Sequence, residues 1–168
     1  MDTDIENTRD VRKTAVINNE LVRLKVDIAA LQETRLAGHG SIREKDFTFF
    51  WHGKSVDERR EHGVGFAVKN TLLRSVEVGS DGNERIATLR LHTKKGTATL
   101  VSVYAHTLYA DDDVKDAFYE RLNLIVGNLP KHDQLVILGD FNARVGADHD
   151  SWAPCLGHFG FGKMNSNG

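Results

Sequence analysis

Four polar residues of this sequence stand where apolar runs end, and together their side chains could serve one reaction. Glu33 ends the run "IAALQE", Tyr104 ends "TLVSVY", and Asp140 and Asn142 follow "QLVIL". Because ligands of α/β proteins gather beyond the carboxyl ends of strands, we expect these side chains to converge on one pocket. Two carboxylates, a phenol and an amide favour a hard cation, Mg²⁺ or Mn²⁺, over zinc. Such a cation is typical of phosphate-ester chemistry.

Each of these residues also has an ordinary structural interpretation. A single Asp or Glu at a strand end more often belongs to a turn or a cap, and a single tyrosine more often packs in the core. Spacing alone leaves both interpretations open. Strand alternation predicts that Asp140 and Asn142 face one side, while Phe141 turns back toward the core.

Periodicity indicates the elements that must carry these residues. Apolar positions three and four apart predict a helix over about 10–25, and its stripe comprises Val11, Thr14, Ile17, Leu21 and Leu24. The run that ends at Glu33 is typical of a strand covered on both faces. Further strands are expected over 47–53 and 62–70.

The second half of the chain is predicted to hold a hairpin, a helix and a last strand. The hairpin spans 85–105 with its turn at 94–96. The helix lies within 109–130, where one of the aspartates at 111–113 can cap it. The strand that leads to Asp140 is expected to be buried. Helices and strands interleave around one inserted hairpin, which predicts an α/β sandwich with mixed sheets.

Composition limits the classes of protein that the chain can belong to. Its 168 residues suffice for one domain, and a net charge of -2 means that any contact with nucleic acid must be local. Cys155 is the single cysteine, which excludes an internal disulfide and a cysteine-rich zinc site. The start "MDTDIENTRD" is unlike a signal peptide, and no run approaches a membrane span. We expect an intracellular protein, nuclear or cytoplasmic, that makes no membrane contact.

Three stretches, "DIAALQETRL", "VSVYAHT" and "LVILGDFNARVG", resemble the endonuclease/exonuclease/phosphatase family. Within that family they are most similar to the endonuclease domains of LINE-type retrotransposons. "LQET" and "GDFN", in this order and about a hundred residues apart, form a specific pair of motifs. The resemblance implies an endonuclease/exonuclease/phosphatase-type α/β sandwich, Mg²⁺-dependent hydrolysis of a phosphodiester, and DNA as the partner.

The resemblance also implies a role for each matching residue. Glu33 would bind the catalytic Mg²⁺, and Tyr104 would touch the scissile phosphate. Asp140 would orient or deprotonate the attacking water, and Asn142 would steady the phosphate in the transition state. Such residues act by positioning and electrostatics around one phosphate.

Two further residues are expected to contact the substrate. Arg35 directly follows "LQET" and could reach a phosphate, although its alternative is an ordinary surface ion pair. Asn165 falls in the "N-x-N-G" stretch that the family carries after its active-site loop.

The sequence departs from the family pattern at both ends. Family members begin with an asparagine-bearing "WNVR"-like strand, where this chain offers only Asn7, and they continue past "NSNG" to a final Asp-His pair. His106 stands where the family has proline, and His149 or His158 could replace the terminal histidine. We therefore expect residues 1–168 to form a single partial domain, truncated at both ends and weakly active or inactive. A non-catalytic binding module, or a phosphatase of the same fold acting on another phosphoester, stays open as an alternative.

Overall fold

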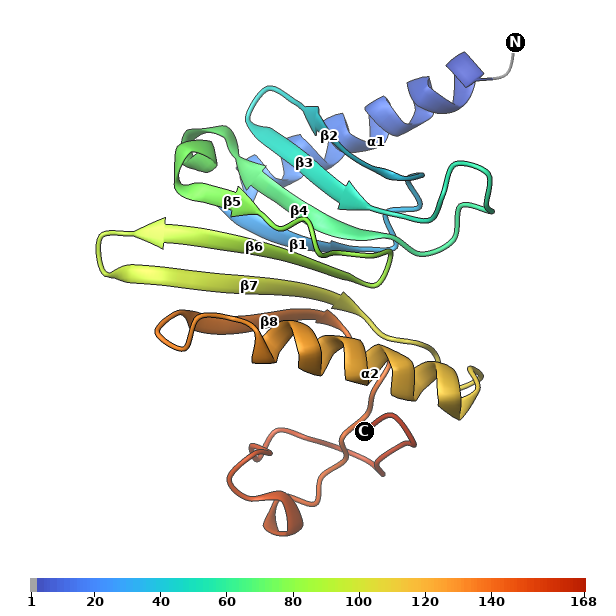
Figure 1. Cartoon of the computed structure of the whole chain (residues 1–168), viewed down its shortest axis with the longest axis vertical. Helices are drawn as coiled ribbons and strands as arrows, with labels where there is room; N and C mark the ends of the chain where they lie inside the picture. Colours follow the sequence, from blue (N-terminus) through green and yellow to red (C-terminus); the bar gives the residue numbers. More distant parts are fainter. Residues whose placement is uncertain (1–2) are drawn as a thin grey trace.

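The computed structural model describes residues 3–168, with side chains from residue 13 onward. These residues form two four-stranded sheets that pack face to face, and a long helix covers the outer face of each (Figure 1). Two short 3₁₀ helices, η1 (Asn70–Ser75) and η2 (Asp150–Trp152), complete the regular structure. None of the helices in the described part of the chain combines the length and apolar character that a membrane span needs.

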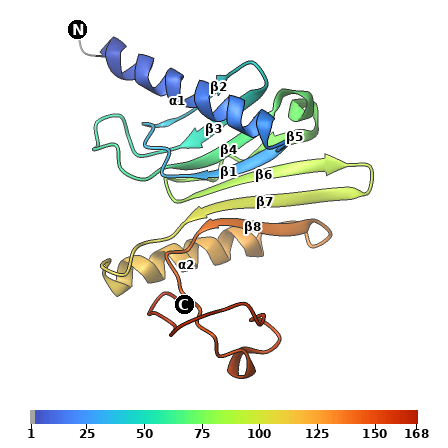
Figure 2. The same cartoon turned by 180° about the vertical axis from the view of Figure 1, so that it is seen from behind.

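The first sheet is antiparallel throughout. Its strands lie in the order β1 (Ile28–Gln32), β4 (Val64–Lys69), β3 (Phe47–His52) and β2 (His39–Arg43). Helix α1 (Thr3–Arg23) lies across its outer face, as Figure 2 shows from behind. Leu21 of this helix packs against Phe47 and Phe49 of β3 and Ala67 of β4, and this contact fixes α1 over these two strands.

The second sheet is mixed. It runs in the order β5 (Val76–Val78), β6 (Ile86–Thr93), β7 (Gly96–Tyr104) and β8 (Gln134–Asp140). Only the pair of β7 and β8 is parallel, because helix α2 (Asp112–Gly127) makes the crossover between them. Phe118 and Leu122 of α2 pack against Val101 and Val103 on the outer face.

The main core lies between the two sheets. Val64, Phe66 and Val68 of β4 face Leu89 and Leu100 of the second sheet, and all five are buried. Fully burying one such side chain contributes about 1.5–3 kcal/mol. This apolar layer therefore supplies much of the stabilisation that holds the sheets, and hence their strand ends, in a fixed relation.

The predicted fold class, an α/β sandwich with mixed sheets, is confirmed. The hairpin is confirmed as well, since Thr93 pairs with Gly96 across its turn. The prediction of a side-chain cap for the second helix is wrong for Asp111, the residue at its N-cap. Asp111 makes no side-chain capping bond, and its carbonyl accepts from the backbone N–H groups of Val114 and Lys115.

The predicted buried face of the first helix needs correction. The helix already begins at Thr3, Ile17 is 38% exposed, and Asn18 is 2% exposed. Asn18 is buried because its side-chain oxygen accepts from the backbone N–H groups of Asp46 and Phe47, at 3.0 and 3.1 Å. The side chains of Asn7 and Val11, both named in the sequence predictions, lie outside the described residues.

The prediction of fully covered strands before Asp140 and before Glu33 is wrong. In β8, Leu135, Val136 and Ile137 are 42%, 39% and 39% exposed, respectively. Strand β1 is half-buried along its whole length. Both strands lie at the end of the strand order of their sheet within residues 3–168, so each has a hydrogen-bonded neighbour on one side only.

Candidate active site

Glu33 and Tyr104 meet at one end of the sandwich, although they belong to different sheets. Glu33 directly follows β1, Tyr104 is the last residue of β7, and the Tyr104 hydroxyl donates a 2.9 Å hydrogen bond to Glu33 Oε1. This bond is the main reason why the pKa of Glu33 lies below its ordinary value. Burial, followed by the same bond, raises the pKa of Tyr104. At neutral pH the pair is therefore a carboxylate held by a neutral phenol.

Arg35 occupies the other oxygen of the same carboxylate. Its guanidinium Nη2 donates to Glu33 Oε2 at 3.0 Å, and this second bond also lowers the pKa of Glu33. Both side chains are exposed, and exposed ion pairs contribute little to stability. In the structure, Arg35 thus forms the ordinary surface ion pair that the sequence analysis kept as its alternative role. Such a weak pair can be exchanged for a pair between Arg35 and an anionic ligand.

Asp140 is the last residue of β8, the parallel neighbour of the Tyr104 strand, and Asn142 follows in the loop after it. Asp140 is the register partner of Tyr104, and its Oδ1 accepts from the Asn142 backbone N–H at 2.8 Å. The Asn142 amide donates to the Ala105 carbonyl at 2.9 Å. Phe141 packs against the core, as alternation predicted. Asn142 lies beyond the end of β8 with a left-handed φ of 49°, so strand alternation does not extend to it, and the prediction that it faces the same side as Asp140 stays a prediction.

Asn165 connects the last segment of the chain to this region. Its side-chain oxygen accepts from the Arg144 backbone N–H at 3.0 Å, and its amide nitrogen lies 3.4 Å from the Asn142 carbonyl. Asn167 donates to the His106 carbonyl at 2.9 Å. Both asparagines thus brace the loop that holds Asn142. A contact between Asn165 and the substrate stays a prediction.

Left-handed backbone is concentrated at this site. In the described chain, non-glycine residues with positive φ are Lys25, Glu33, Arg35, His62 and Asn142. All but Lys25 belong to the site or contact it. A residue held in this region costs about 1–3 kcal/mol and persists where its surroundings determine it. The concentration of strain here supports a functional role for these loops.

Sequence reasoning missed a buried arginine under Tyr104. Arg85 is 7% exposed, its Cζ lies 5.0 Å from the centre of the Tyr104 ring, and its Nη1 donates to the Tyr104 and Ala105 carbonyls. The His62 ring centre lies 6.0 Å from that of Tyr104. Burial lowers the pKa of both His62 and His106, so both rings are neutral at neutral pH. Counting hairpin register back from the turn could have found Arg85, which precedes the partner of Val103.

The two histidines proposed as substitutes for a terminal catalytic histidine lie elsewhere. His149 and His158 stack on each other with ring centres 3.6 Å apart, and His149 Nδ1 lies 3.1 Å from Asp150 Oδ1. Among the described contacts of these histidines, none reaches Glu33 or Tyr104. The structure therefore does not bring them to the candidate site.

The donor set at Glu33 fits a hard, largely hydrated cation. Glu33 is ionised and exposed, so its carboxylate oxygens can serve as metal ligands. Within the described residues, no group of three His, Cys, Asp or Glu side chains could hold a metal ion. Mg²⁺ keeps several waters and uses one or two carboxylates, whereas structural zinc needs four protein ligands. Glu33 with water therefore suits Mg²⁺ or Mn²⁺ and does not suit zinc.

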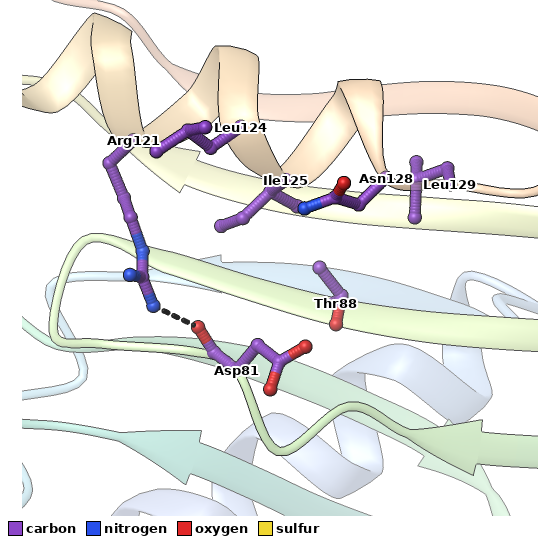
Figure 3. A pocket seen from close by; sticks show the side chains of 7 residues that line it. All are labelled: Asp81, Thr88, Arg121, Leu124, Ile125, Asn128 and Leu129. Atoms are coloured by element: carbon purple, nitrogen blue, oxygen red, sulfur yellow. Dashed lines mark hydrogen bonds between the residues drawn. The ribbon is translucent and has the colours of Figure 1, made fainter.

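A hollow lies between α2 and the loop that precedes β6 (Figure 3). Arg121 of the helix donates to the Asp81 carbonyl at 2.9 Å across its mouth, and Leu124, Ile125 and Thr88 line its wall. None of the residues predicted to carry chemistry contributes to this wall. The candidate active site is therefore the region around Glu33.

Fold and site together define an α/β-sandwich protein with an oxygen-rich polar site at its strand ends. The family model described as Endonuclease/Exonuclease/phosphatase family matches residues 5–163, and the chain belongs to that family, as its motifs predicted. Craniofacial development protein 2 of Bos taurus is 32% identical over 158 residues, and that of Tragulus javanicus is 31% identical over 157. The alignments cover 93% of this chain and 26% of each relative, so the chain spans about a quarter of their length.

Two solved structures are also similar. One is the endonuclease domain of TRAS1, a telomere-specific non-LTR retrotransposon, with 20% identity and a TM-score of 0.48. That match covers 77% of this chain and 54% of the other. The second is the inositol polyphosphate 5-phosphatase domain of SPsynaptojanin, with 17% identity, a TM-score of 0.30, and coverage of 64% and 35%.

Proposed function

We propose that this chain is a Mg²⁺-dependent phosphodiesterase domain that hydrolyses DNA, as a retrotransposon-derived endonuclease would. The observation that carries the proposal is the 2.9 Å hydrogen bond between Tyr104 and Glu33, with Asp140 in register beside Tyr104. It supports a single site with an ionised carboxylate, a neutral phenol and a second carboxylate. Membership of the Endonuclease/Exonuclease/phosphatase family supports the reaction class.

Each residue has a distinct part in this proposal. Glu33 would hold Mg²⁺ together with water, and the ion would supply Lewis-acid chemistry at the phosphate. Tyr104 keeps Glu33 ionised and oriented. Asp140 orients the attacking water and accepts its proton as the new P–O bond forms. The P–O bond to the sugar oxygen breaks, and that oxygen leaves as an alcohol after it takes a proton from solvent water. Asn142 donates to a phosphate oxygen with the amide hydrogen that its bond to the Ala105 carbonyl leaves available.

Arg35 completes the proposed substrate contacts. Its guanidinium leaves Glu33 and pairs with a phosphate, because arginine matches phosphate geometry with two parallel bonds. This exchange also exposes the Glu33 oxygen to which Arg35 donates. The arginine thus neutralises the carboxylate before substrate binds and the phosphate afterwards.

We further propose that turnover by the 168-residue polypeptide is slow. Among the side chains of residues 13–168, no group of three His, Cys, Asp or Glu residues that could hold a metal ion forms at Glu33. His149 and His158 pair within their own loop. Catalytic groups act as a unit, so a partial set retains only a small part of the full rate.

A second candidate is a non-catalytic binding module with a decayed site. The observation that favours it is that the chain itself satisfies the groups concerned. Glu33 already pairs with Arg35, and the amides of Asn142 and Asn165 already bond to backbone groups. A module of this kind would bind nucleic acid and leave it intact.

Plasmid nicking tests the proposal. Supercoiled DNA is incubated with the chain and Mg²⁺ or Mn²⁺, beside bis-p-nitrophenyl phosphate as a general diester and inositol bisphosphate as a non-DNA monoester. We expect slow metal-dependent nicking that Glu33→Gln and Asp140→Asn abolish. Glu77→Gln, at an exposed carboxylate of β5, is the matched control and should nick like the parent chain.

The other outcomes each point to a rival. Monoester hydrolysis without nicking would favour the phosphatase. DNA binding without turnover of any substrate would favour the binding module. Nicking that survives Asp140→Asn would contradict the assigned role of Asp140.

A further inference from the structure

A cavity of about 190 Å³ lies on the α1 side of Glu33, between that helix and the ends of β1 and β3. Glu33 and Arg35 form part of its wall, so the cavity adjoins the candidate active site directly. Phe49 and Trp51 of β3 and Ile17 of α1 supply the apolar part of the wall. The role proposed for the site residues does not use this space.

Size and wall chemistry limit what the cavity can hold. Clefts for drug-sized ligands measure roughly 300–1,000 Å³, so this smaller cavity suits a single flat ring system. The half-buried indole of Trp51 offers a surface on which a planar ring packs, and Phe49, which is 3% exposed, contributes to the wall from the core. An aliphatic chain would match this apolar wall but would leave its polar part unused.

The polar part of the wall points to a ring that can form hydrogen bonds. Thr14 and Thr34 line the cavity beside the apolar residues. Residues of this type carry groups that donate and accept hydrogen bonds. A heteroaromatic ring carries edge nitrogen or oxygen atoms that can pair with polar groups of such a wall, whereas a hydrocarbon does not.

The charged residues of the wall favour an anion beside that ring. Lys13 and Arg35 both line the cavity, and both are exposed to solvent. Among the described residues of the wall, Glu33 is the only acidic one, and the Tyr104 hydroxyl and Arg35 already hold its carboxylate. A flat heteroaromatic ring attached to a phosphate matches both halves of the wall, and a nucleotide has this chemistry.

We propose that this cavity binds one base of a nucleotide whose phosphate pairs with Arg35. The inference rests on the proposed function for its choice of a nucleic-acid ligand, and it deepens that function by adding a base-binding subsite next to Glu33. A base held there would place its own phosphate at the edge of the candidate active site.

Tryptophan fluorescence provides a test that needs no hydrolysis. The sequence has two tryptophans, and Trp152 does not line the cavity, so a Trp152→Phe background reports on Trp51 alone. This chain is titrated, without metal, with deoxyadenosine 5′-monophosphate and with deoxyribose 5-phosphate, which lacks the base. We expect a saturable change with the nucleotide and roughly 10-fold or more weaker binding of the sugar phosphate, because stacking is lost.

A matched pair of variants locates the binding. Ile17→Phe fills the cavity from α1, while Val16→Phe adds the same ring at the exposed neighbouring position outside the wall. We expect nucleotide affinity to fall roughly 10-fold or more in Ile17→Phe and to stay unchanged in Val16→Phe. Arg35→Ala should weaken both ligands, whereas Arg121→Ala, which removes an exposed arginine of the other hollow, should weaken neither.

Equal binding of the nucleotide and the sugar phosphate in the parent background would overturn the proposal, and this comparison does not depend on the folding of any wall variant. Unchanged affinity in a folded Ile17→Phe chain would overturn it as well. Because metal is absent and no bond is broken, the result is independent of plasmid nicking. Nucleotide binding without nicking would keep the subsite and count against the hydrolase.

Discussion

The hydroxyl of Tyr104 lies 2.9 Å from Oε1 of Glu33, a residue 71 positions earlier in the chain and attached to the other sheet. The bond joins the end of β7 to the loop after β1 at one end of the sandwich. It also sets two charge states, since it lowers the pKa of the carboxyl and raises that of the phenol. The chemistry proposed for the site depends on this pairing.

The first prediction concerns the charge of Glu33. Tyr104→Phe removes the bond that contributes most to the lowered pKa of Glu33, so this pKa should move up toward its ordinary value. A pH titration of the side-chain carboxyl carbons by NMR measures the change. Tyr119→Phe, which removes a hydroxyl from α2, should leave the Glu33 titration as it is in the parent chain. An unchanged curve in Tyr104→Phe would mean that another group sets the pKa.

The second prediction concerns metal binding. Mg²⁺ should bind weakly, because in the described chain Glu33 belongs to no group of three ligand side chains and water would have to fill the other coordination positions. Losing even a group that orients a ligand costs roughly 10–100-fold in affinity, so Glu33→Gln should weaken binding by at least about 10-fold. Calorimetric titration measures both chains, with Glu77→Gln as the control. Equal affinities in the parent chain and Glu33→Gln would refute the metal role.

The third prediction separates the backbone role of Asn142 from its chemical role. Asn142→Ala keeps a side chain at φ 49°, which costs about 1–2 kcal/mol, while Asn142→Gly relieves that cost. The alanine variant should therefore be less stable in urea than the glycine variant. Both lack the amide, so both should lose plasmid nicking. Nicking by the glycine variant at the parent rate would show that the amide only shapes the turn.

The fourth prediction concerns acid stability, away from the site. The side chain of Asp133 is 1% exposed and accepts from Arg90 Nε at 3.0 Å and from the Thr99 hydroxyl at 2.9 Å. The bond from Arg90 lowers the pKa of Asp133 most. Because the folded pKa lies below the unfolded value of about 3.9, the stabilisation is present above that pH and is lost as pH falls through the folded pKa.

The free energy of unfolding of Asp133→Asn should therefore be lower than that of the parent chain at pH 7. The difference between the two free energies should become smaller below about pH 4. Urea unfolding at a series of pH values measures it. Asp57→Asn, in an exposed loop, provides the control and should follow the parent curve. A gap of constant size at every pH would show that Asp133 acts through packing and not through its charge.

Local features of this protein could be predicted from the sequence because they depend on residues close together in the chain. The turn between β6 and β7 follows from its glycine after two lysines, and α2 follows from apolar spacing ended by Gly127 and Pro130. The motifs also led to the family. They indicated that Glu33, Tyr104 and Asp140 stand at strand ends, which is where the structure has them.

The tertiary structure decided which side chains are buried and which groups they contact. The apolar residues of β8 predicted a covered strand. The strand is exposed because it lies at the end of the strand order of its sheet, and the local sequence pattern does not encode that order. Asn18 is buried in α1 because two backbone N–H groups of another segment need its oxygen. Arg85 lies under Tyr104 because hairpin pairing sets it opposite that residue. Side-chain types and spacing thus determined the chemistry available to this protein, whereas strand order and long-range hydrogen bonds decided which groups meet, because both require segments distant in sequence to pack together.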